Sequence, residues 1–277
     1  MDGQLKKGTK LQSNTGNTYT VEKLLGSGGQ GEVYEVSGVA GKCALKWYFK
    51  NSATAQQENI LRDLIAHGKP SDGFLWTEDL VKNAESFGYI MGIRPKEFSS
   101  IEDFMKRRVN PSFESLVLTC YNLTKGFQVL HSDGYQYRDI SRSNVFFNAD
   151  NGDVLICDND NVVPNGEEKG GVLGTQSFMA PEIVCGEALP SRKTDLYSLA
   201  VLLFHMLFVS HLLNGALEAK IRCLDYKALN KLYGTHPVFI FAPCDDSNRP
   251  VKGIHDNALD IRYRTKIDTL LTKEVAF

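Results

Sequence analysis

The sequence predicts an α+β fold in which a β-rich first third is followed by a mostly helical remainder. Three strand-like runs, over residues 19–25, 32–36 and 42–49, alternate apolar and polar side chains and are separated by glycines. After residue 100 the apolar spacing becomes helical, over residues 101–108, 112–131 and 196–209. With 277 residues, the chain is long enough for one large domain or for two lobes.

The segments between these runs complete the expected architecture. Residues 53–66 carry apolar side chains at helical spacing and end before Gly68-Lys69-Pro70, which predicts a helix. Strands are expected around residues 74–81 and 86–93. We place the lobe boundary near Gly92, so that residues 17–93 form the N-lobe and 94–277 the C-lobe. Residues 217–233 are expected to be helical and 242–250 to form a turn-rich loop.

Composition excludes several classes of protein. The hydrophobic fraction is 42%, the charged fraction 23% and the net charge −2, so no overall field attracts nucleic acid or an anionic membrane. The six cysteines form no CxxC pair, which favours reduced thiols in the cytoplasm over a disulfide framework or a zinc site. The N-terminus lacks the apolar core of a signal peptide, and the longest apolar run is shorter than the roughly 20 residues that span a bilayer.

A glycine-rich stretch follows the first strand. Gly26-Ser27-Gly28-Gly29-Gln30-Gly31-Glu32-Val33 fits the pattern GxGxxGxV, in which backbone N–H groups approach nucleotide phosphates and Val33 packs on the base. A dinucleotide-binding turn would need a helix directly after the glycines, whereas the residues after Gly31 alternate like a strand. A plain turn without a ligand stays open as the alternative for the motif taken by itself.

The third strand contains Ala44-Leu45-Lys46. A small Ala44 leaves room for adenine, and Lys46 is expected to reach the α- and β-phosphates. In the next helix, Glu58 is better placed than Asp63 to meet that strand. We therefore expect an ion pair between Lys46 and Glu58 that holds the lysine in position. An exposed strand lysine without a ligand is the alternative for Lys46 alone.

The middle of the chain carries the most specific pattern. Tyr137-Arg138-Asp139 is followed by Asn144, by Asp158 and by Ala180-Pro181-Glu182. An Asp that accepts a hydroxyl proton, and an Asn and an Asp that hold magnesium, are the components of phosphoryl transfer. From about residue 19 to 209 the chain resembles the eukaryotic-like protein kinases, bacterial members included. The resemblance implies a two-lobed kinase fold, with ATP and Mg²⁺ bound by the chain and a protein as the substrate.

The resemblance also assigns roles to individual residues. It implies that Asp139 is the catalytic base, that Asn144 and Asp158 are magnesium ligands, and that Asp195 holds the backbone of the catalytic loop. Met91 would be the gatekeeper in front of a hinge formed by Gly92, Ile93 and Arg94, whose backbone would bind adenine. The residues from Gly174 to Glu182 resemble the platform for the peptide substrate, which favours Ser/Thr as the acceptor.

Several positions depart from the family pattern. Asp158-Asn159-Asp160 stands where Asp-Phe-Gly is usual, and we expect this segment to flip out less readily because Gly visits backbone angles that cost Asp energy. No Ser, Thr or Tyr lies between Asp158 and Gly174, so the usual activation-loop phosphorylation has no acceptor there. One hypothesis is that Glu167 or Glu168 pairs with Arg138 instead; a solvated acidic loop is the alternative.

Two further departures concern the acceptor and the late part of the chain. Ser141 occupies the position where Ser/Thr kinases usually have Lys, and the residues around it match neither the Ser/Thr nor the Tyr kinase pattern, so Tyr as the acceptor stays open as the alternative. Arg142 would assist the phosphate charge in place of that Lys or lie on the surface. The family's late arginine, which pairs with the Glu of Ala-Pro-Glu, would be Arg249 opposite Glu182. The chain ends within an amphipathic run that starts at Ile267, from which we expect a regulatory segment beyond the C-terminus.

Three classes of function remain at this point. An active protein kinase is best supported. A pseudokinase scaffold would be favoured if the altered segment at Asp158 were unable to hold magnesium. A small-molecule phosphotransferase shares an Asp followed five residues later by Asn, but it is not expected to carry Gly174-Thr175 together with Ala180-Pro181-Glu182.

Overall fold

Residues 3–166 and 171–256 are described by the computed structural model, and the chain divides into two compact units. Unit 1 comprises Met1–Phe98 and Leu155–Val163, and unit 2 comprises Ser99–Val154 and Pro164–Phe277. The boundary thus lies at residues 98/99, five residues after the expected position. The sequence predicted one boundary, whereas in the structure the later segment Leu155–Val163 also belongs to unit 1.

Unit 1 is built on an antiparallel sheet of six strands in the order β1-β2-β3-β4-β6-β5. The strands expected from the alternating runs all form, within a few residues of their predicted bounds. The elements are β1 (Lys10–Gln12), β2 (Thr18–Ser27), β3 (Gly31–Gly38), β4 (Gly41–Tyr48), α1 (Ala55–His67), β5 (Thr77–Lys82) and β6 (Phe87–Met91). The short β1 was not predicted, because three residues are too few to show a period.

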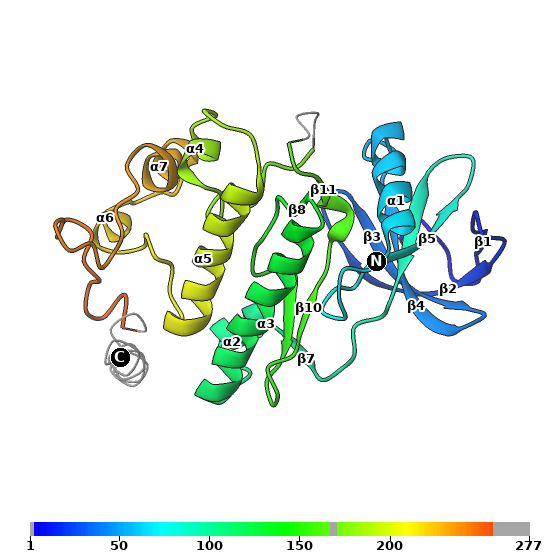
Figure 1. Cartoon of the computed structure of the whole chain (residues 1–277), viewed down its shortest axis with the longest axis horizontal. Helices are drawn as coiled ribbons and strands as arrows, with labels where there is room; N and C mark the ends of the chain where they lie inside the picture. The colour runs from blue at the N-terminus through cyan, green and yellow to red at the C-terminus, as the bar shows by residue number, and fades with distance from the viewer. Residues whose placement is uncertain (1–2, 167–170, 257–277) are drawn as a thin grey trace. The chain divides into compact units, whose positions relative to one another are not determined.

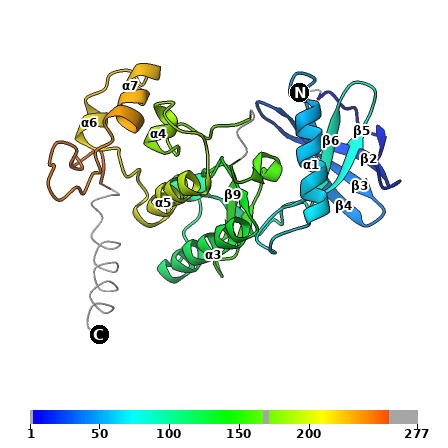
Figure 2. The same cartoon turned by 45° about the horizontal axis from the view of Figure 1, so that its top comes forward.

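The two faces of this sheet bury different clusters. Along β4, Leu45 and Trp47 pack on one face with Val21, Val36 and other apolar side chains. The alternate residues Ala44 and Tyr48 pack on the other face with Leu61 of α1. Figure 2 shows α1 lying along the sheet. Because side chains alternate along a strand, Lys46 points to the same face as Ala44 and Tyr48.

The segment that returns to unit 1, Leu155–Val163, contains the end of one strand and a short helical turn. Strand β10 (Val154–Ile156) is followed by the 3₁₀ turn η1 (Asn159–Asn161). The backbone N–H of Leu75 donates to the carbonyl of Ile156 at 2.9 Å, and the N–H of Ile156 donates to the carbonyl of Gly73 at 2.7 Å. These bonds attach the segment that carries Asp158 to the chain just before β5.

Unit 2 is mostly helical, and its two long helices, α3 and α5, lie side by side (Figure 1). The helix α3 begins after the N-cap Ser112, and α5 begins after a capping box formed by Ser191 and Thr194. The further elements are β7 (Phe98–Ser100), α2 (Ile101–Met105), α3 (Phe113–Ser132), β8 (Tyr135–Gln136), β9 (Val145–Asn148), β11 (Val163–Pro164), α4 (Pro181–Val184), α5 (Arg192–Phe208), α6 (Ala216–Ala219), α7 (Tyr226–Asn230) and the π-helical turn η2 (Lys231–Thr235).

The helix predicted over residues 217–233 is wrong as a single element. The chain forms α6, leaves the helical conformation, and starts again as α7 and η2. The break occurs because Asp225 has an extended backbone and its side chain accepts from the N–H of Ala228, which makes it the N-cap of a new helix. The amphipathic run from Ile267 lies outside the described residues.

The other bulk expectations concern membranes and cysteines. No helix within residues 3–166 and 171–256 has both the length and the apolar character needed to cross a membrane. All six cysteines are free thiols. Cys223 and Cys244 are exposed, so only the other four are at least partly buried, as their apolar surroundings predicted.

Candidate active site

The glycine-rich stretch forms the turn between β2 and β3, where the N–H of Gly28 donates to the carbonyl of Gly31 at 2.8 Å. A Cβ added to Gly26 would meet no described atom within 4 Å, and one added to Gly28 would meet only the Gly31 carbonyl, at 4.0 Å. A Cβ on Gly31 would lie 2.2 Å from the carbonyl oxygen of Trp47. Packing therefore requires Gly31, whereas no described atom lies close enough to Gly26 or Gly28 to require glycine at those positions.

Lys46 lies in the middle of β4 and is 6% exposed. Its ammonium group is 3.0 Å from Asp160 Oδ2, 3.1 Å from Asp160 Oδ1 and 3.3 Å from Asp158 Oδ1. Burial lowers the pKa of Lys46, but the carboxylates of Asp160 and Asp158 outweigh burial and raise that pKa above its ordinary value. The lysine therefore stays charged at neutral pH.

The predicted ion pair between Lys46 and Glu58 is not formed. Glu58 Oε1 instead contacts the guanidinium of Arg62, one helical turn later, and the ammonium group of Lys82 at 3.4 Å. The residue of α1 that faces Lys46's surroundings is Gln57, whose Nε2 donates to the backbone carbonyl of Asp160 at 2.8 Å. Adjacent helix positions point about 100° apart, so the prediction chose the neighbour of the inward-facing position.

The segment Asp158-Asn159-Asp160 has its unusual backbone angle at the first residue. Asp158 lies in the left-handed region, with φ 53° and ψ 42°, while Asp160 lies within η1 and has no positive φ. Asp160 therefore has ordinary backbone angles in this structure, and the expectation that the segment flips out less readily stays a prediction. The buried Asn159 is held by its side chain, which donates to the carbonyls of Leu75 at 2.7 Å and Ile156 at 3.2 Å.

Met91 ends β6 beside the strand of Lys46. It is buried in the cluster that includes Ala44, its partner in the β4–β6 register. Val33 is partly buried and packs against the same cluster. Gly92, Ile93 and Arg94 follow without regular structure, and Arg94 Nη1 donates to the carbonyl of Phe98 at 3.0 Å. These positions are compatible with a gatekeeper and a hinge, whose roles stay predictions.

In unit 2, Asp195 holds the chain before Asp139. Its carboxylate accepts from the backbone N–H of Tyr137 at 2.6 Å and of Arg138 at 2.9 Å, and lies 3.0 Å from Nε2 of His131. Arg138 has a left-handed φ of 72°, a conformation that costs a bulky residue energy. The position expected for Asp195, against the backbone of this loop, is confirmed.

Asp139 is oriented by two side-chain donors. The hydroxyl of Thr175 donates to Asp139 Oδ1 at 2.8 Å, and Asn144 Nδ2 donates to Asp139 Oδ2 at 3.0 Å and to its backbone carbonyl at 2.9 Å. Asn144 Oδ1 accepts only a longer bond, from the hydroxyl of Ser143 at 3.2 Å. The loop thus fixes a partly exposed carboxylate beside an amide oxygen, which suits a hard cation.

The other residues that depart from the family pattern interact with side chains near them in the sequence or on the surface. Ser141 is buried, with its hydroxyl 2.9 Å from that of Ser143. Arg142 Nε lies 3.6 Å from Glu102 Oε2, and both side chains are 44% exposed, so Arg142 is a surface arginine in this structure. Arg249 pairs with Asp246, not with Glu182. Glu167 and Glu168 lie outside the described residues, so their proposed pairing with Arg138 stays a hypothesis.

Comparison with known proteins decides the family. The sequence model of the protein kinase domain family matches residues 19–265 of the chain. The chain belongs to the protein kinase domain family. The expected two-lobed kinase fold is confirmed. The antiparallel sheet of unit 1 and the helices of unit 2 fit that family.

Relatives of this kinase domain occur in plants, bacteria and fungi. It is 28% identical over 199 residues to a probable serine/threonine-protein kinase, CCRP1, of Zea mays, which is 68% of this chain and 31% of that protein. Protein kinase YegI of Escherichia coli is 23% identical over 221 residues, 74% of this chain and 34% of that protein. Serine/threonine-protein kinase SCH9 of Saccharomyces cerevisiae is 23% identical over 215 residues, which is 72% of this chain and 25% of that protein. The chain spans about a third or less of the length of each of these three relatives.

The predicted site residues of the kinase domain fall into two sets. Unit 1 holds the glycine turn, Lys46, Asp158 and the residues around Met91, and unit 2 holds Asp139 and Asn144. Sequence analysis missed the contacts of Lys46 with Asp160 and of Asp139 with Thr175. The sequence signal for the contact of Lys46 with Asp160 is the acidic residue that stands where Gly is usual, whose carboxylate contacts the lysine.

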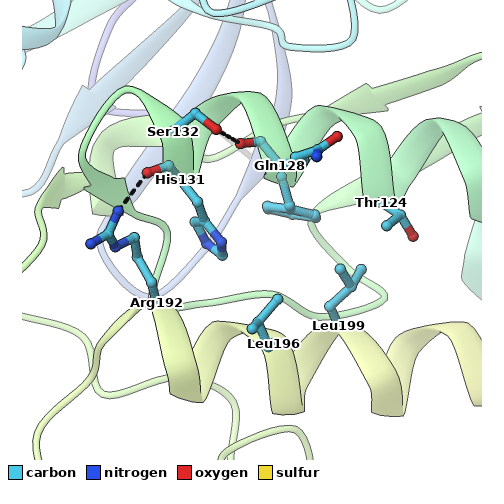
Figure 3. A pocket seen from close by; sticks show the side chains of 8 residues that line it. Thr124, Gln128, His131, Ser132, Arg192, Leu196 and Leu199 are labelled. Atoms are coloured by element: carbon cyan, nitrogen blue, oxygen red, sulfur yellow. Dashed lines mark hydrogen bonds between the residues drawn. The ribbon is translucent and has the colours of Figure 1, made fainter.

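The kinase domain also has a pocket in unit 2 away from these residues (Figure 3). It lies between α3 and α5, with a volume of about 440 Å³, and is lined by Thr124, Phe127, Gln128, His131, Ser132, Arg192, Leu196 and Leu199. Arg192 Nη1 donates to the carbonyl of His131 at 2.8 Å across its rim. Nothing in the pocket resembles the machinery of phosphoryl transfer.

Proposed function

We propose that this kinase domain transfers the γ-phosphate of ATP to the hydroxyl group of a protein, with Ser or Thr as the acceptor. The observation that carries the proposal is the fixed orientation of the Asp139 carboxylate by Thr175 and Asn144. A general base must present its oxygen to the hydroxyl proton in a defined direction, and two donors on one carboxylate provide that direction.

The proposed chemistry uses residues of both units. The acceptor oxygen forms a bond to the γ-phosphorus while the bond from that phosphorus to the β,γ-bridging oxygen breaks, and ADP leaves. The acceptor proton passes to the Asp139 carboxylate. Lys46 donates to oxygens of the α- and β-phosphates, and the backbone N–H groups of the glycine turn bind the phosphates from the side of β2 and β3.

Magnesium fits the residues that the family assigns to it. Asp158 keeps a carboxylate whose side chain is 39% exposed, and Asn144 keeps an amide oxygen with one long bond. When bound, the ion would neutralise charge on the phosphates. A pseudokinase would be favoured if the altered segment at Asp158 failed to hold magnesium, and the exposed carboxylate of Asp158 supports the active kinase instead.

The choice of acceptor follows from Thr175. Its hydroxyl touches the proposed base directly, within the stretch that resembles the peptide platform. The relatives from Zea mays and Saccharomyces cerevisiae are both described as serine/threonine-protein kinases. A location in the cytoplasm accompanies this proposal, since six free thiols suit a reducing compartment.

The test is transfer of labelled γ-phosphate from ATP with Mg²⁺ to the protein itself and to a generic protein substrate, followed by phosphoamino-acid analysis. Asp139→Asn is expected to lower the rate by about 10²- to 10⁴-fold, the usual contribution of a general base. Asp150→Asn, a change at an exposed loop position of the same unit, is the matched control and should leave the rate unchanged. ATP binding without transfer to any hydroxyl would overturn the proposal in favour of a scaffold.

A further inference from the structure

Asp160 places a carboxylate inside unit 1, where it is 1% exposed. Burying a charged carboxylate is strongly unfavourable unless donors satisfy its oxygens. Three side chains do so: Lys46 contacts both oxygens, the hydroxyl of Tyr48 donates to Oδ2, and the hydroxyl of Tyr89 donates to Oδ1 at 3.2 Å. We call Asp160, Lys46, Tyr48 and Tyr89 the Asp160 cluster.

The cluster is assembled from regular structure and is not a chance surface contact. Lys46 and Tyr48 lie two residues apart on β4, and Tyr89 is the register partner of Lys46 on β6. All three therefore point to the sheet face that α1 covers. Gln57 of α1 closes the cluster from the helix side, with its Nε2 2.8 Å from the Asp160 carbonyl and 3.3 Å from the Tyr48 hydroxyl.

The acidic residues of α1 have other surroundings. Glu58 is engaged by Arg62 and Lys82, and Asp63 is exposed. The helix thus contributes to the Asp160 cluster an amide, from Gln57, but no carboxylate. Asp158 is a second carboxylate partner of Lys46, at 3.3 Å. It is also the residue proposed to bind the metal ion, so it is not reserved for the lysine.

We propose that Asp160 is the positioning residue for Lys46, doing from the segment after β10 what a glutamate on the neighbouring helix would otherwise do. The inference rests on the proposed function, since it concerns how Lys46 meets the phosphates of ATP. Asp160 keeps two oxygens on the ammonium group even when Asp158 turns to another ligand. The direction of Lys46 is then set by the sheet and by η1, and a change in the acidic residues of α1 leaves it unaltered.

The first experiment compares Asp160→Asn with Glu58→Gln in the full chain. Asp160→Asn is expected to lower kcat/KM for ATP at least tenfold, while Glu58→Gln stays within twofold of the unaltered protein. Adenosine, which has no phosphate, should bind both variants with unchanged affinity, because Lys46 does not reach the base. Equal losses in the two variants, or no loss in Asp160→Asn, would overturn the inference.

A second readout needs no ATP. Acylation of Lys46 by a small amine-reactive reagent, followed by peptide mass spectrometry, reports how firmly the ammonium group is held. Labelling is expected to be several-fold faster in Asp160→Asn than in the unaltered protein, and unchanged in Glu58→Gln. Unchanged labelling in Asp160→Asn would refute the positioning role even in a protein that transfers no phosphate, so the two proposals fail separately.

A third variant moves the carboxylate to α1. Asp160→Gly removes it from the segment, and Gln57→Glu added to Asp160→Gly supplies one from the helix position that reaches the Tyr48 hydroxyl. The double variant should regain at least a third of the kcat/KM lost in Asp160→Gly. A purely structural role of Asp160 predicts no such recovery, and that outcome would count against the inference even if Asp160→Asn fails to fold.

Discussion

A single lysine shows how much a neighbour can change a familiar pattern. Lys46 lies on the strand predicted from the sequence around it, and its ammonium group pairs with the carboxylates of Asp158 and Asp160. The identity of those carboxylates was not predictable from the helix that follows, because a helix rotates about 100° per residue and one position decides whether a side chain faces inward. The sequence gives the spacing of residues along α1. Which side of the helix faces the sheet is set by the packing of Leu61 and Leu64, the buried residues of α1.

Two buried histidines in unit 2 make stability depend on pH. His205 stacks on Phe178, with ring centroids 5.2 Å apart, and neither of its ring nitrogens has a hydrogen-bond partner among the described residues. Nε2 of His211 lies 2.7 Å from the Ser177 carbonyl. Burial, the neighbouring His211 and the charge of Arg142 together lower the pKa of His205 to about 3. Burial lowers the pKa of His211 to about 4, with a smaller contribution from Arg142, although the hydrogen bond to the Ser177 carbonyl acts in the opposite direction.

The sign of the effect follows from the lowered values. The unfolded chain binds protons at these histidines below about pH 6.5, where the folded chain does not. Stability from the two neutral rings is therefore complete above that pH and falls, by about 1.4 kcal/mol per pH unit for each ring, as the pH drops toward the folded values. We expect the free energy of unfolding to be lower at pH 5 than at pH 7.5 by several kcal/mol.

Urea unfolding at the two pH values checks this prediction. His205→Leu should remove about half of the pH dependence, whereas His236→Leu, at an exposed position, should leave it intact. Parallel pH profiles for His205→Leu and the unaltered protein would show that the ring is protonated in the folded state or that other groups dominate.

At the scale of elements, the glycine turn separates packing from binding. A Cβ added to Gly31 would lie so close to the carbonyl of Trp47 that β3 and β4 must move apart, whereas a Cβ added to Gly28 would meet only the Gly31 carbonyl, at 4.0 Å. We predict that Gly31→Ala lowers the free energy of unfolding by about 1–3 kcal/mol, the usual cost of overpacking. Gly28→Ala should leave stability within about 0.5 kcal/mol and weaken ATP binding.

Thermal or chemical unfolding, together with direct titration of ATP, measures both halves of this prediction. Adenosine serves as the control ligand, because it lacks the phosphates that the turn is proposed to contact. A Gly28→Ala protein that binds ATP as tightly as the unaltered chain would leave the turn with no phosphate-binding role.

The elements that the sequence predicted well are long runs in which apolar residues recur regularly and form one buried face. The strands β2, β3 and β4 and the helices α3 and α5 lie within a few residues of their expected bounds. The elements missed are short or set by one side chain: β1 has three residues, and α7 exists because Asp225 caps it. The site shows the same division, since Asp139, Asn144 and Asp195 follow from local motifs, while the Asp160 cluster needs three-dimensional packing.

At the scale of the whole molecule, regulation is expected to differ from that of kinases switched by activation-loop phosphorylation. Residues 159–173 contain no Ser, Thr or Tyr. The proposed base is oriented by the unmodified hydroxyl of Thr175. We predict that treatment with a broad-specificity phosphatase leaves the rate of phosphoryl transfer within twofold, because no phosphate is needed to order Asp139.

Mass spectrometry before and after treatment shows whether phosphate was removed, and a phosphatase-inhibited sample is the control. A strong loss of activity, restored by incubation with ATP, would show that a phosphorylated residue elsewhere in the chain takes over the switch.

The Asp160 cluster also limits which amino acids can change together. If residue 160 supplies the carboxylate for the lysine, the helix needs no acidic side chain for that purpose, and in this structure Glu58 pairs with Arg62 and Lys82 instead. We expect the two positions to covary among homologues. Sequences with Gly at the position of Asp160 should carry an inward-facing acidic residue in the helix, and a sequence with neither should have lost phosphoryl transfer.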